Sequence, residues 1–586
     1  MTKPIRIANC SGYFGDRPTA AREMVEGGPI DVLTGDWLAE LTMLILARAR
    51  AKRPGGGYAR TFVTQMEEVM GTCLDKGIKV VSNAGGLDPD GCAEAVAEVA
   101  ERLGLRPKIA YVRGDDLMAR LPEMVAADTL RHFETGEPIK DVSRYLTANA
   151  YLGCWGIVDA LKQGADIVIT GRCTDAAVVC GPAAWHHGWS IDDWDRLAGG
   201  VAAGHVIECS TQATGGNYSF FTEVQGMNHP GFPWAEVSED GSSVIGKHDG
   251  TGGEVSIGTV TSQLLYEIGT PAYLGPDVTT RFDTIELEQL APDRVRMSGI
   301  QGEQPPSTLK VAMNRAGGFR QDMNVCLTGL DIEAKAALIE EAFWTSCPFS
   351  PDDFSQVTTR VLRTEHPDPS TNEQGVAQWR ISVKDPDEKK VGRAFSDALV
   401  HLALASIPGF FWIGGPPSAG RPYGVYEPAL VPAELVPQEV VLLGDETAIV
   451  ESLIPAAGEV VVRPAPGPGV AVPQGPSRRA PLGEVLGARS GDKGGDANLG
   501  VFARTDEAWA WLDSFLTVER LRGLLPELEP LPVERFRLPG LRSLNFIIHG
   551  LLEEGVAAST RQDPQAKSLG EWLRARVVDI PEVLLS

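Results

Sequence analysis

Short apolar runs alternate with helix-like stretches through the N-terminal half of this chain. Helical apolar spacing lies between several of the runs, at Trp37–Ala51, Tyr58–Asp75 and Gly91–Leu103. Apolar strands that alternate with helices are typical of right-handed βαβ units around a parallel sheet buried on both faces. The pattern predicts an α/β fold with a parallel, Rossmann-like sheet in the N-terminal half and a mainly helical insert over 113–151. The expected strands are Ile5–Cys10, Ile30–Thr34, Ile78–Ser82, Ile109–Val112, Ile167–Thr170 and His205–Cys209.

The character of the sequence changes near residue 250. From there to about residue 450, β-branched segments and turns surround two clear helical patterns, Asp331–Trp344 and Lys390–Ser406, which predicts an α+β second layer. Leu453–Pro481 is dense in proline and glycine and is typical of a linker. The rest of the chain predicts a small C-terminal α+β sandwich. Because 586 residues are too many for one core, we place domains at 1–250, 251–450 and 482–586, with the linker at 451–481.

The net charge and the cysteine pattern indicate which partners and which cellular compartment to expect. The formal net charge is −25, so the chain lacks the basic surface that nucleic acid or an anionic membrane attracts. Its nine cysteines form no C-x-x-C pair, which favours a reducing compartment. The N-terminus has no apolar signal segment, and no stretch approaches roughly 18 apolar residues. We expect a cytoplasmic protein that contacts neither nucleic acid nor membrane, although main-chain N–H groups and a few basic side chains can still bind a small anion.

Each expected strand of the N-terminal half ends in a cluster of small and polar residues. In open α/β sheets, ligands bind outside the carboxyl ends of the strands, where glycines allow close approach and helix N-termini offer free N–H groups. For any single cluster, turn formation and helix capping are the better explanation, but six clusters at one edge favour a site there. The candidates for substrate binding are Ser11, Gly12, Asn83, Gly85, Gly86, Asp115, Thr174, Gly215, Gly216 and Asn217.

The segment after the fifth expected strand, GRCTD, has the most varied chemistry. Arg172 can pair with a carboxylate or phosphate, and Asp175 can act as a general base if burial raises its pKa. Asp36 and Asp115 are the other carboxylates that can work with Asp175, and each alone equally fits a helix cap. Cys173 fits packing better than nucleophilic attack. The catalytic candidates are therefore Asp175, Arg172 and Asp36.

The segment RSGDKGGDANLG, at 489–500, combines glycines with charged and amide side chains between two expected strands. Such a loop can bind an anion through its N–H groups, and the alternative is a salt-bridged hairpin. Its candidates for substrate binding are Arg489, Ser490, Asp492, Lys493 and Asn498. The sequence contains no G-x-G-x-x-G, G-x-S-x-G, H-E-x-x-H or H-x-H motif, and the loop does not match a Walker A motif.

Two groups of motifs resemble a known family. The segments NCSGYFGDR, SNAGGLDP, TGRCTDAA and ATGGN are similar to the acyclic terpene utilization AtuA-like family, over roughly residues 4–445. RSGDKGGDANLG is similar to the signature of the small AtuA-related domain, over 482–584, which is fused behind the main domain in some members and separate in others.

This resemblance implies a role in bacterial citronellol and geraniol catabolism, where branched acyl-CoA esters are carboxylated, hydrated and cleaved. A metal-dependent lyase of the hydroxymethylglutaryl type needs the H-x-H pair that the sequence lacks, so we expect no metal and metal-free acid–base chemistry, as a hydro-lyase or carbon–carbon lyase. We expect no cofactor, with coenzyme A as part of the substrate, and a homo-oligomer. Two alternatives remain open: a non-catalytic acyl-CoA-binding or assembly subunit of a carboxylase pathway, and a hydrolase or ligase of another carboxylic substrate.

Overall fold

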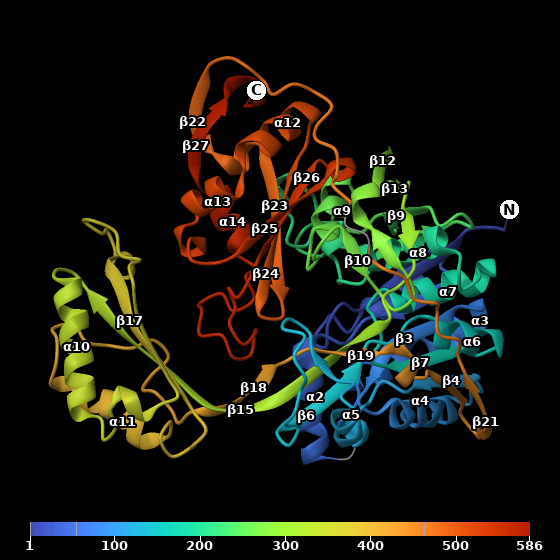
Figure 1. The fold of residues 1–586 in the computed structure, drawn as a ribbon, viewed down its shortest axis with the longest axis horizontal. Helices are drawn as coiled ribbons and strands as arrows, with labels where there is room; N and C mark the ends of the chain where they lie inside the picture. Colours follow the sequence, from blue (N-terminus) through green and yellow to red (C-terminus); the bar gives the residue numbers. More distant parts are fainter. Residues whose placement is uncertain (1, 54, 461–462, 586) are drawn as a thin grey trace. The chain divides into compact units, whose positions relative to one another are not determined.

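The computed structural model describes residues 2–53, 55–460 and 463–585 (Figure 1). These residues form two compact units. The first comprises Met1–Asn314, Tyr426–Val556 and Gln565–Ser586, and the second comprises Arg315–Val425 and Ala557–Pro564. The domain boundaries expected near residues 250, 450 and 481 stay predictions.

Parallel strands form the centre of the first unit, as the alternating apolar pattern predicts. Within the described residues its largest sheet has the order β12-β13-β9-β8-β1-β2-β3-β7-β4-β20-β21. The strands from β1 to β4 in this order run parallel to one another: β1 (Ile5–Asn9), β2 (Val32–Gly35), β3 (Lys79–Gly86), β7 (Ile167–Gly171) and β4 (Ile109–Arg113). Antiparallel strands extend both edges: β8 (Pro233–Val237), β9 (Ser243–Lys247), β13 (Arg294–Ser298), β12 (Glu286–Ala291), β20 (Glu439–Leu442) and β21 (Asp445–Glu451).

The order of these parallel strands does not confirm a Rossmann-like arrangement. A Rossmann sheet reverses its strand order at the first strand, which places a crevice there. Here β1, β2 and β3 follow one another in a single direction, and β7 lies between β3 and β4. The mixed α/β class with parallel strands is therefore confirmed, and the finer topology is not.

Two separate hydrophobic cores cover the two faces of the sheet. Successive strand residues point to opposite faces, so Val80 joins one core while Val81 joins the other. The helices of the first core are α1 (Ala20–Gly27), α2 (Glu40–Lys52), α3 (Arg60–Lys76) and α4 (Pro89–Leu103). The second core includes helices α6 (Trp155–Lys162), α7 (Ala177–His187), α8 (Trp194–Ile207) and α9 (Ile257–Leu264).

The prediction of a sixth strand at His205–Cys209 is wrong. Helix α8 ends at Ile207, so this segment is the end of the helix and the residues that follow it. Small residues explain the difference, since they let α8 pack closely on its neighbours. A Cβ on Gly199 would lie 2.0 Å from the Gly241 carbonyl oxygen, and one on Gly204 would lie 2.7 Å from the Cα of Ala176. The run of apolar residues therefore continues a buried helix rather than beginning a strand.

The expectation of a mainly helical insert over 113–151 is also wrong. Its one α-helix among the described residues is α5 (Leu121–Ala126), followed by β5 (Arg131–His132) and β6 (Tyr145–Ala150). β6 pairs with β15 (Thr308–Thr328). The hydrogen-bonding partner that makes β6 a strand is therefore supplied from far along the chain, where local sequence spacing does not reveal it.

The C-terminal part of the first unit is a four-stranded antiparallel sheet packed on helices, labelled at the top of Figure 1. Its strand order is β23 (Leu486–Lys493), β24 (Asp496–Ala503), β26 (Ser543–Ile548) and β25 (Val533–Leu538). One core joins it to α12 (Asp506–Phe515), α13 (Val518–Leu524) and α14 (Leu569–Arg574). The last five residues of the expected linker form β22 (Ser477–Pro481), which pairs with β27 (Val577–Pro581).

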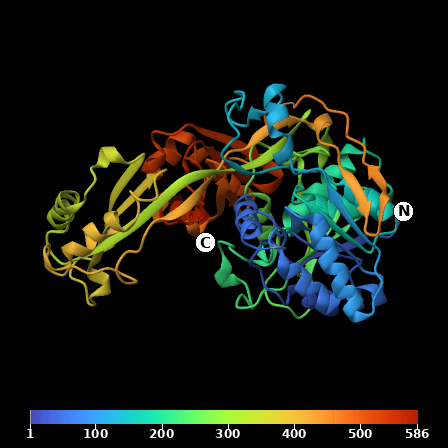
Figure 2. The same ribbon diagram turned by 90° about the horizontal axis from the view of Figure 1, so that it is seen from below.

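The second unit has its own sheet and core. The distal part of β15, the long arrow in Figure 2, pairs with β17 (Val376–Asp385), which pairs with β16 (Gln356–Leu362). Apolar side chains of this sheet pack against α10 (Ile332–Ser346) and α11 (Arg393–Val400). Both helices lie where the sequence pattern predicts them.

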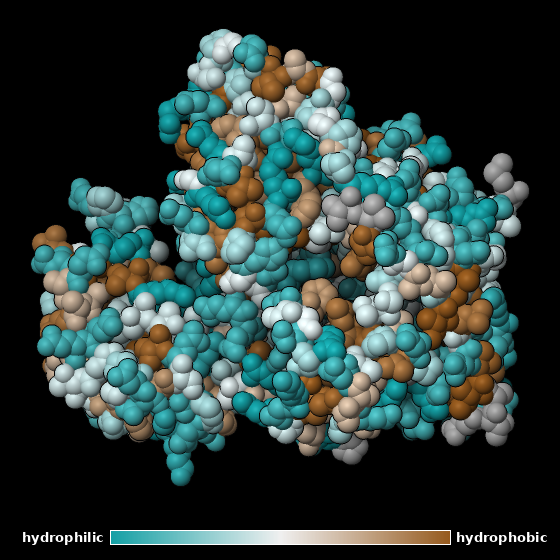
Figure 3. Space-filling view, viewed as in Figure 1, coloured by the Kyte–Doolittle hydropathy of each residue, from teal (hydrophilic) through white to brown (hydrophobic). Residues whose placement is uncertain are grey.

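Hydrophilic and hydrophobic side chains are interspersed on the face of the molecule drawn in Figure 3. Within the ranges that the structure describes, no helix combines the length and the apolar character needed to cross a bilayer.

Candidate functional site

The carboxyl ends of the first three parallel strands are joined by hydrogen bonds around Asp36 and Asn83. Asn83 Nδ2 donates to Asp36 Oδ1, and Asn83 Oδ1 accepts from the amide of Trp37 at 2.8 Å. The Leu38 amide also donates to Asp36 Oδ1, at 3.1 Å, and the Asp36 amide donates to the Ser11 carbonyl at 2.9 Å. Asp36 and Asn83 are both buried. The loop after β2 is therefore held over the end of β3 by an amide and a carboxyl group.

Arg172 and Asp175 form an ion pair at the end of the neighbouring strand β7. Arg172 Nη2 lies 2.9 Å from Asp175 Oδ1, and Arg172 Nη1 donates to the Leu38 carbonyl at 2.6 Å. The guanidinium also lies 4.2 Å from the centre of the Tyr151 ring. The Arg172 side chain is 3% exposed, whereas the Asp175 side chain is 33% exposed. Asp175 is therefore the member of the pair that a ligand can reach.

Asp115, which follows β4, is a buried carboxyl group that holds the backbone of Arg172 in place. Its Oδ2 accepts from the Arg172 amide at 2.8 Å and from Asn149 Nδ2 at 2.8 Å. Burial raises the pKa of Asp115 to about 7, against these hydrogen bonds, which lower it. A Cβ on Gly171 would lie 2.3 Å from Asp115 Oδ1, so glycine is needed for this close approach. The contacts of Asp115 are with the protein, which makes it a support for Arg172.

The C-terminal end of α8 adds two ionisable groups that the sequence analysis missed, Glu208 and His205. They are three residues apart and so lie on one face of the helix end, with His205 Nδ1 at 3.4 Å from Glu208 Oε1. His205 Nε2 lies 3.2 Å from the Gln263 carbonyl, which places the proton on Nε2. Both side chains are buried. The sequence analysis missed this pair because it predicted a strand here. Helical spacing, in contrast, brings residues 205 and 208 to the same face.

Four carboxyl groups from distant parts of the chain interact electrostatically, and we call them the carboxyl cluster: Asp36, Asp175, Glu208 and Glu267. Burial and then the charge of Asp175 raise the pKa of Asp36 well above its usual value, whereas Arg172 lowers it. Burial, followed by Asp175 and Glu267, raises the pKa of Glu208 well above its usual value. Asp36 and Glu208 therefore hold a proton more readily than an ordinary solvent-exposed carboxyl group does.

Cationic and aromatic side chains surround this cluster. Burial and then the charge of Lys493 lower the pKa of His205 to about 4, so the imidazole is neutral near pH 7. Burial and the charge of Glu208 raise the pKa of Tyr273, whose ring lies 5.4 Å from that of His205. The Lys493 ammonium lies 5.7 Å from the centre of the Tyr273 ring. The surroundings thus mix cations, a neutral imidazole and a protonated phenol.

The C-terminal hairpin β23–β24 interacts with this cluster through Lys493. Lys493 Nζ donates to the Glu267 carbonyl at 2.8 Å. Asn498 Oδ1 accepts from the Glu267 amide at 2.8 Å, and its Nδ2 donates to the Leu265 carbonyl at 2.9 Å. Asn498 therefore holds the 265–267 segment in place, while Lys493 extends a positive charge towards the carboxyl groups.

Two glycines of this hairpin allow the same segment to pack against it. A Cβ on Gly500 would lie 2.5 Å from the Cβ of Leu265, and one on Gly491 would lie 2.6 Å from the Tyr266 ring. Both distances are shorter than side chains tolerate. The signature RSGDKGGDANLG is thus in part a packing surface for residues 265–267.

Several expected binding residues have structural contacts. Gly12 packs against residues 209–210, where a Cβ would lie 2.2 Å from the Ser210 amide nitrogen, and the Gly12 amide donates to Asp16 Oδ2 at 2.8 Å. Gly85 packs against the Thr170 carbonyl. Gly86 has a φ of +55°, which favours glycine. The Ser11 hydroxyl donates to the Tyr13 carbonyl at 3.1 Å, and the Thr174 amide donates to the Leu152 carbonyl at 2.9 Å.

The glycine pair 215–216 uses its amides inside its own loop. They donate to the carbonyls of Gln212 and Thr211, at 3.1 Å and 2.9 Å, so neither points freely towards a ligand. Asn217, the next residue, lines a small pocket of about 240 Å³ together with Arg489 and Ser490. Asp492 lies on β23 opposite Ala497. Of the expected binding residues, Asn83 and Lys493 interact with the carboxyl cluster, and Asn217, Arg489 and Ser490 line this pocket.

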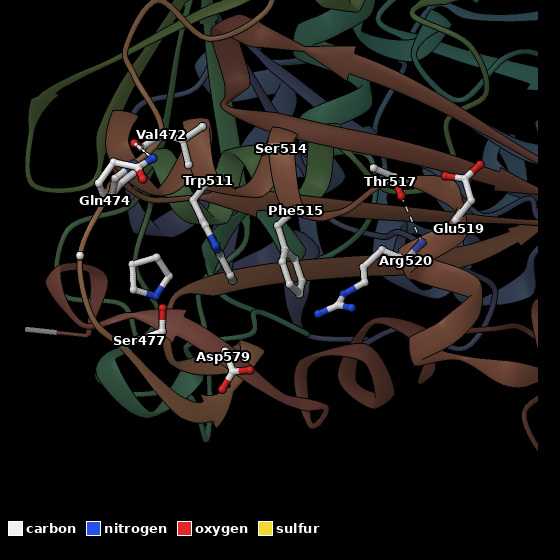
Figure 4. A pocket seen from close by; sticks show the side chains of 13 residues that line it. Val472, Gln474, Ser477, Trp511, Ser514, Phe515, Thr517, Glu519, Arg520 and Asp579 are labelled. Atoms are coloured by element: carbon white, nitrogen blue, oxygen red, sulfur yellow. Dashed lines mark hydrogen bonds between the residues drawn. The ribbon is translucent and has the colours of Figure 1, made fainter.

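The larger pocket, of about 750 Å³, lies elsewhere in the C-terminal part (Figure 4). Trp511, Phe515 and Arg520, from α12 and α13, face Ser477 and Asp579 of the β22–β27 pair across it. The rings of Trp511 and Phe515 are stacked with centroids 4.7 Å apart. Among the residues that the structure describes, its lining includes none of the candidates from the sequence analysis. We therefore place the candidate site at the carboxyl cluster.

In the described part of the chain, no three His, Cys, Asp or Glu side chains are grouped so that they could bind a metal ion. Burial raises the pKa of the Cys173 thiol to about 12, which agrees with a packing role for this residue.

Comparison with known proteins assigns almost the whole chain to family models. A model described as acyclic terpene utilisation family protein AtuA matches residues 5–442. A second model, the AtuA ferredoxin-like domain, matches residues 480–579. No curated protein and no solved structure matches the chain.

Proposed function

The chain belongs to the acyclic terpene utilisation AtuA family, and from this premise we propose that it is an enzyme of terpenoid catabolism that performs acid–base chemistry on a branched acyl-CoA ester or a related carboxylate. The reaction is a hydration–dehydration or a carbon–carbon cleavage of a 3-hydroxyacyl-CoA-type substrate. Both reactions need one group that accepts a proton and another that donates one. Coenzyme A enters as part of the substrate.

The observation that carries this proposal is the pairing of an accessible carboxylate with buried, proton-holding carboxyl groups. Asp175 is ion-paired with Arg172 and partly exposed, whereas burial raises the pKa of both Asp36 and Glu208. Neighbouring carboxyl groups whose environments separate their pKa values are typical of acid–base pairs in enzymes.

The roles follow from these environments. Asp175 accepts a proton from the carbon or hydroxyl group of the substrate, and Glu208 supplies one to the departing oxygen or to the developing enolate. Arg172 uses Nη1 and Nη2 on Leu38 and Asp175, so we assign it a positioning role that fixes Asp175. Lys493 adds a positive charge near the cluster, which stabilises negative charge that develops on the substrate.

The test is turnover of a panel of acyl-CoA esters, followed by mass spectrometry. We expect Asp175→Asn and Glu208→Gln each to lower kcat by about 10²- to 10⁴-fold, the range for loss of a general acid or base. Asp249→Asn is the control, because the Asp249 side chain is 99% exposed. Because Glu208 must be protonated to act, kcat should fall as the pH rises through its raised pKa.

Other outcomes are equally informative. Full activity of Asp175→Asn would remove the role assigned to that residue. Binding of an acyl-CoA ester by the wild-type protein with no chemical change would favour a non-catalytic acyl-CoA-binding subunit instead.

A further inference from the structure

The small pocket beside the C-terminal hairpin has a cationic lining. It is formed by residues 217–221, by 488–490 of β23 and by 567–571, all of which belong to the first unit. Two basic side chains, Arg489 and Lys567, line it, together with the side chains of Asn217 and Ser219. A positive pocket on a chain with a formal net charge of −25 is a local exception to the overall charge.

Arg489 has hydrogen-bonding capacity that the protein does not use. Its side chain is buried, and its guanidinium carbon lies over the Tyr266 ring, 4.0 Å from the ring centre. Nη2 donates to Gln212 Oε1 at 2.6 Å and Nη1 donates to the Ser490 carbonyl at 3.4 Å. Within the described residues, Nε has no hydrogen-bond partner. Since a guanidinium has five N–H donors, three of them have no acceptor from the described chain.

Lys567 brings a second positive charge to the same place. Its ammonium lies 5.9 Å from the centre of the Tyr266 ring that Arg489 covers. The carboxylate among the lining residues, Glu571, is engaged by Arg574, whose Nη1 donates to both Glu571 oxygens at 2.8 Å. An anion near this ring would be attracted by both positive charges.

We propose that this pocket binds a single oxyanion group, a carboxylate or a phosphate monoester, carried by a small molecule. A planar guanidinium offers paired donors that match the oxygens of either group. A volume of about 240 Å³ accommodates the anion and a few attached carbons rather than a whole drug-sized ligand. The bound group is the anionic end of the substrate, an identification that rests on the proposed function, whereas the binding of an oxyanion does not.

The experiment is calorimetric titration of the full-length protein with inorganic phosphate and, separately, with glutarate. We expect at least one of them to bind the wild-type protein, and Arg489→Gln and Lys567→Gln each to weaken that binding at least about tenfold, because each removes a charge-assisted contact to the anion. The matched control is Arg520→Gln, which removes a cation from the larger pocket and should leave the affinity unchanged.

The two titrations distinguish a phosphate ligand from a carboxylate ligand. Binding of phosphate alone assigns a phosphate-bearing ligand, and binding of glutarate alone assigns a carboxylate. If Arg489→Gln does not fold, Arg489→Lys retains the charge and should bind at least about fivefold more weakly, since lysine lacks the paired donors. Failure of both anions to bind, or equal binding by all variants, would overturn the proposal. Asp175→Asn should retain anion binding even if it loses turnover, so this inference and the proposed function can fail independently.

Discussion

Individual side chains at the candidate site are ionised or neutral according to how deeply they are buried. Asp115 and Asp175 both follow parallel strands, yet their environments differ. Asp115 is buried and accepts hydrogen bonds only from the protein in the contacts that the structure describes, whereas a third of the Asp175 side chain is exposed. The same residue type can therefore support a loop at one position and remain available to a substrate at another.

The raised pKa of Asp115 makes stability depend on pH. The folded protein holds the Asp115 proton up to about pH 7, whereas an unfolded chain loses it near about pH 4. This contribution to stability is complete below the unfolded pKa and is lost as the pH rises through the folded one. We expect Asp115→Asn to remove up to about 4 kcal/mol of pH-dependent change in the free energy of unfolding. Urea denaturation between about pH 4 and pH 8 measures this slope, and Asp249→Asn should leave it unchanged.

Two secondary-structure elements, helix α8 and the hairpin β23–β24, position functional groups of the candidate site. The end of α8 presents His205 and Glu208 together, and the hairpin presents Lys493. Both elements depend on small residues at their contacts. Gly204 allows α8 to approach Ala176, and Gly500 allows the hairpin to approach Leu265.

A methyl group at position 500 should therefore disturb the packing of the hairpin. Gly500→Ala places its Cβ 2.5 Å from the Cβ of Leu265, which is fully buried, and overpacking of this kind costs about 1–3 kcal/mol. We expect a lower free energy of unfolding and faster proteolysis within 463–476. The control is Gly523→Ala in α13, where a Cβ meets no atom within 4 Å and helix propensity favours alanine. Equal stability of Gly500→Ala and wild type would contradict this packing role.

At the scale of the whole molecule, the two units have separate hydrophobic cores. The core of the second unit is formed by β15, β16 and β17 with α10 and α11. The C-terminal sheet has another core with α12, α13 and α14. The core of the second unit contains only residues of that unit, whereas the C-terminal sheet also contributes Phe502 and Leu538 to the core of the large sheet. A local loss of packing in the second unit should therefore destabilise mainly that unit.

Phe395→Ala tests this independence. Phe395 is fully buried in the second unit, where it packs against Phe343 with ring centroids 5.1 Å apart, and its loss should cost about 3–5 kcal/mol. Hydrogen exchange should become faster in α10, α11, β16 and β17, and stay unchanged in the parallel strands of the first unit. Phe546→Ala, in the C-terminal core, should instead speed exchange in β24, β26 and α12 and leave α10, α11, β16 and β17 unchanged. Faster exchange throughout the chain in either variant would show that the cores unfold as one.

The sequence by itself determined the elements whose signals are local. The five parallel strands from Ile5 to Gly171 and helices such as α3, α4 and α10 appear as predicted, because strand and helix periodicity is visible within a short window. It also indicated that Asp36 and Arg172 approach one another, since the carboxyl ends of parallel strands share an edge.

Tertiary structure alone decided the strand order, the helical state of 194–207 and the membership of the carboxyl cluster. A run of glycine and alanine is compatible with a strand or a buried helix, and only the neighbours of Gly199 and Gly204 select the helix. Glu208 and Glu267 carry no motif, and their meeting with Lys493 depends on contacts between residues hundreds of positions apart. Burial, which sets their protonation, is a property of that assembly and not of any local segment.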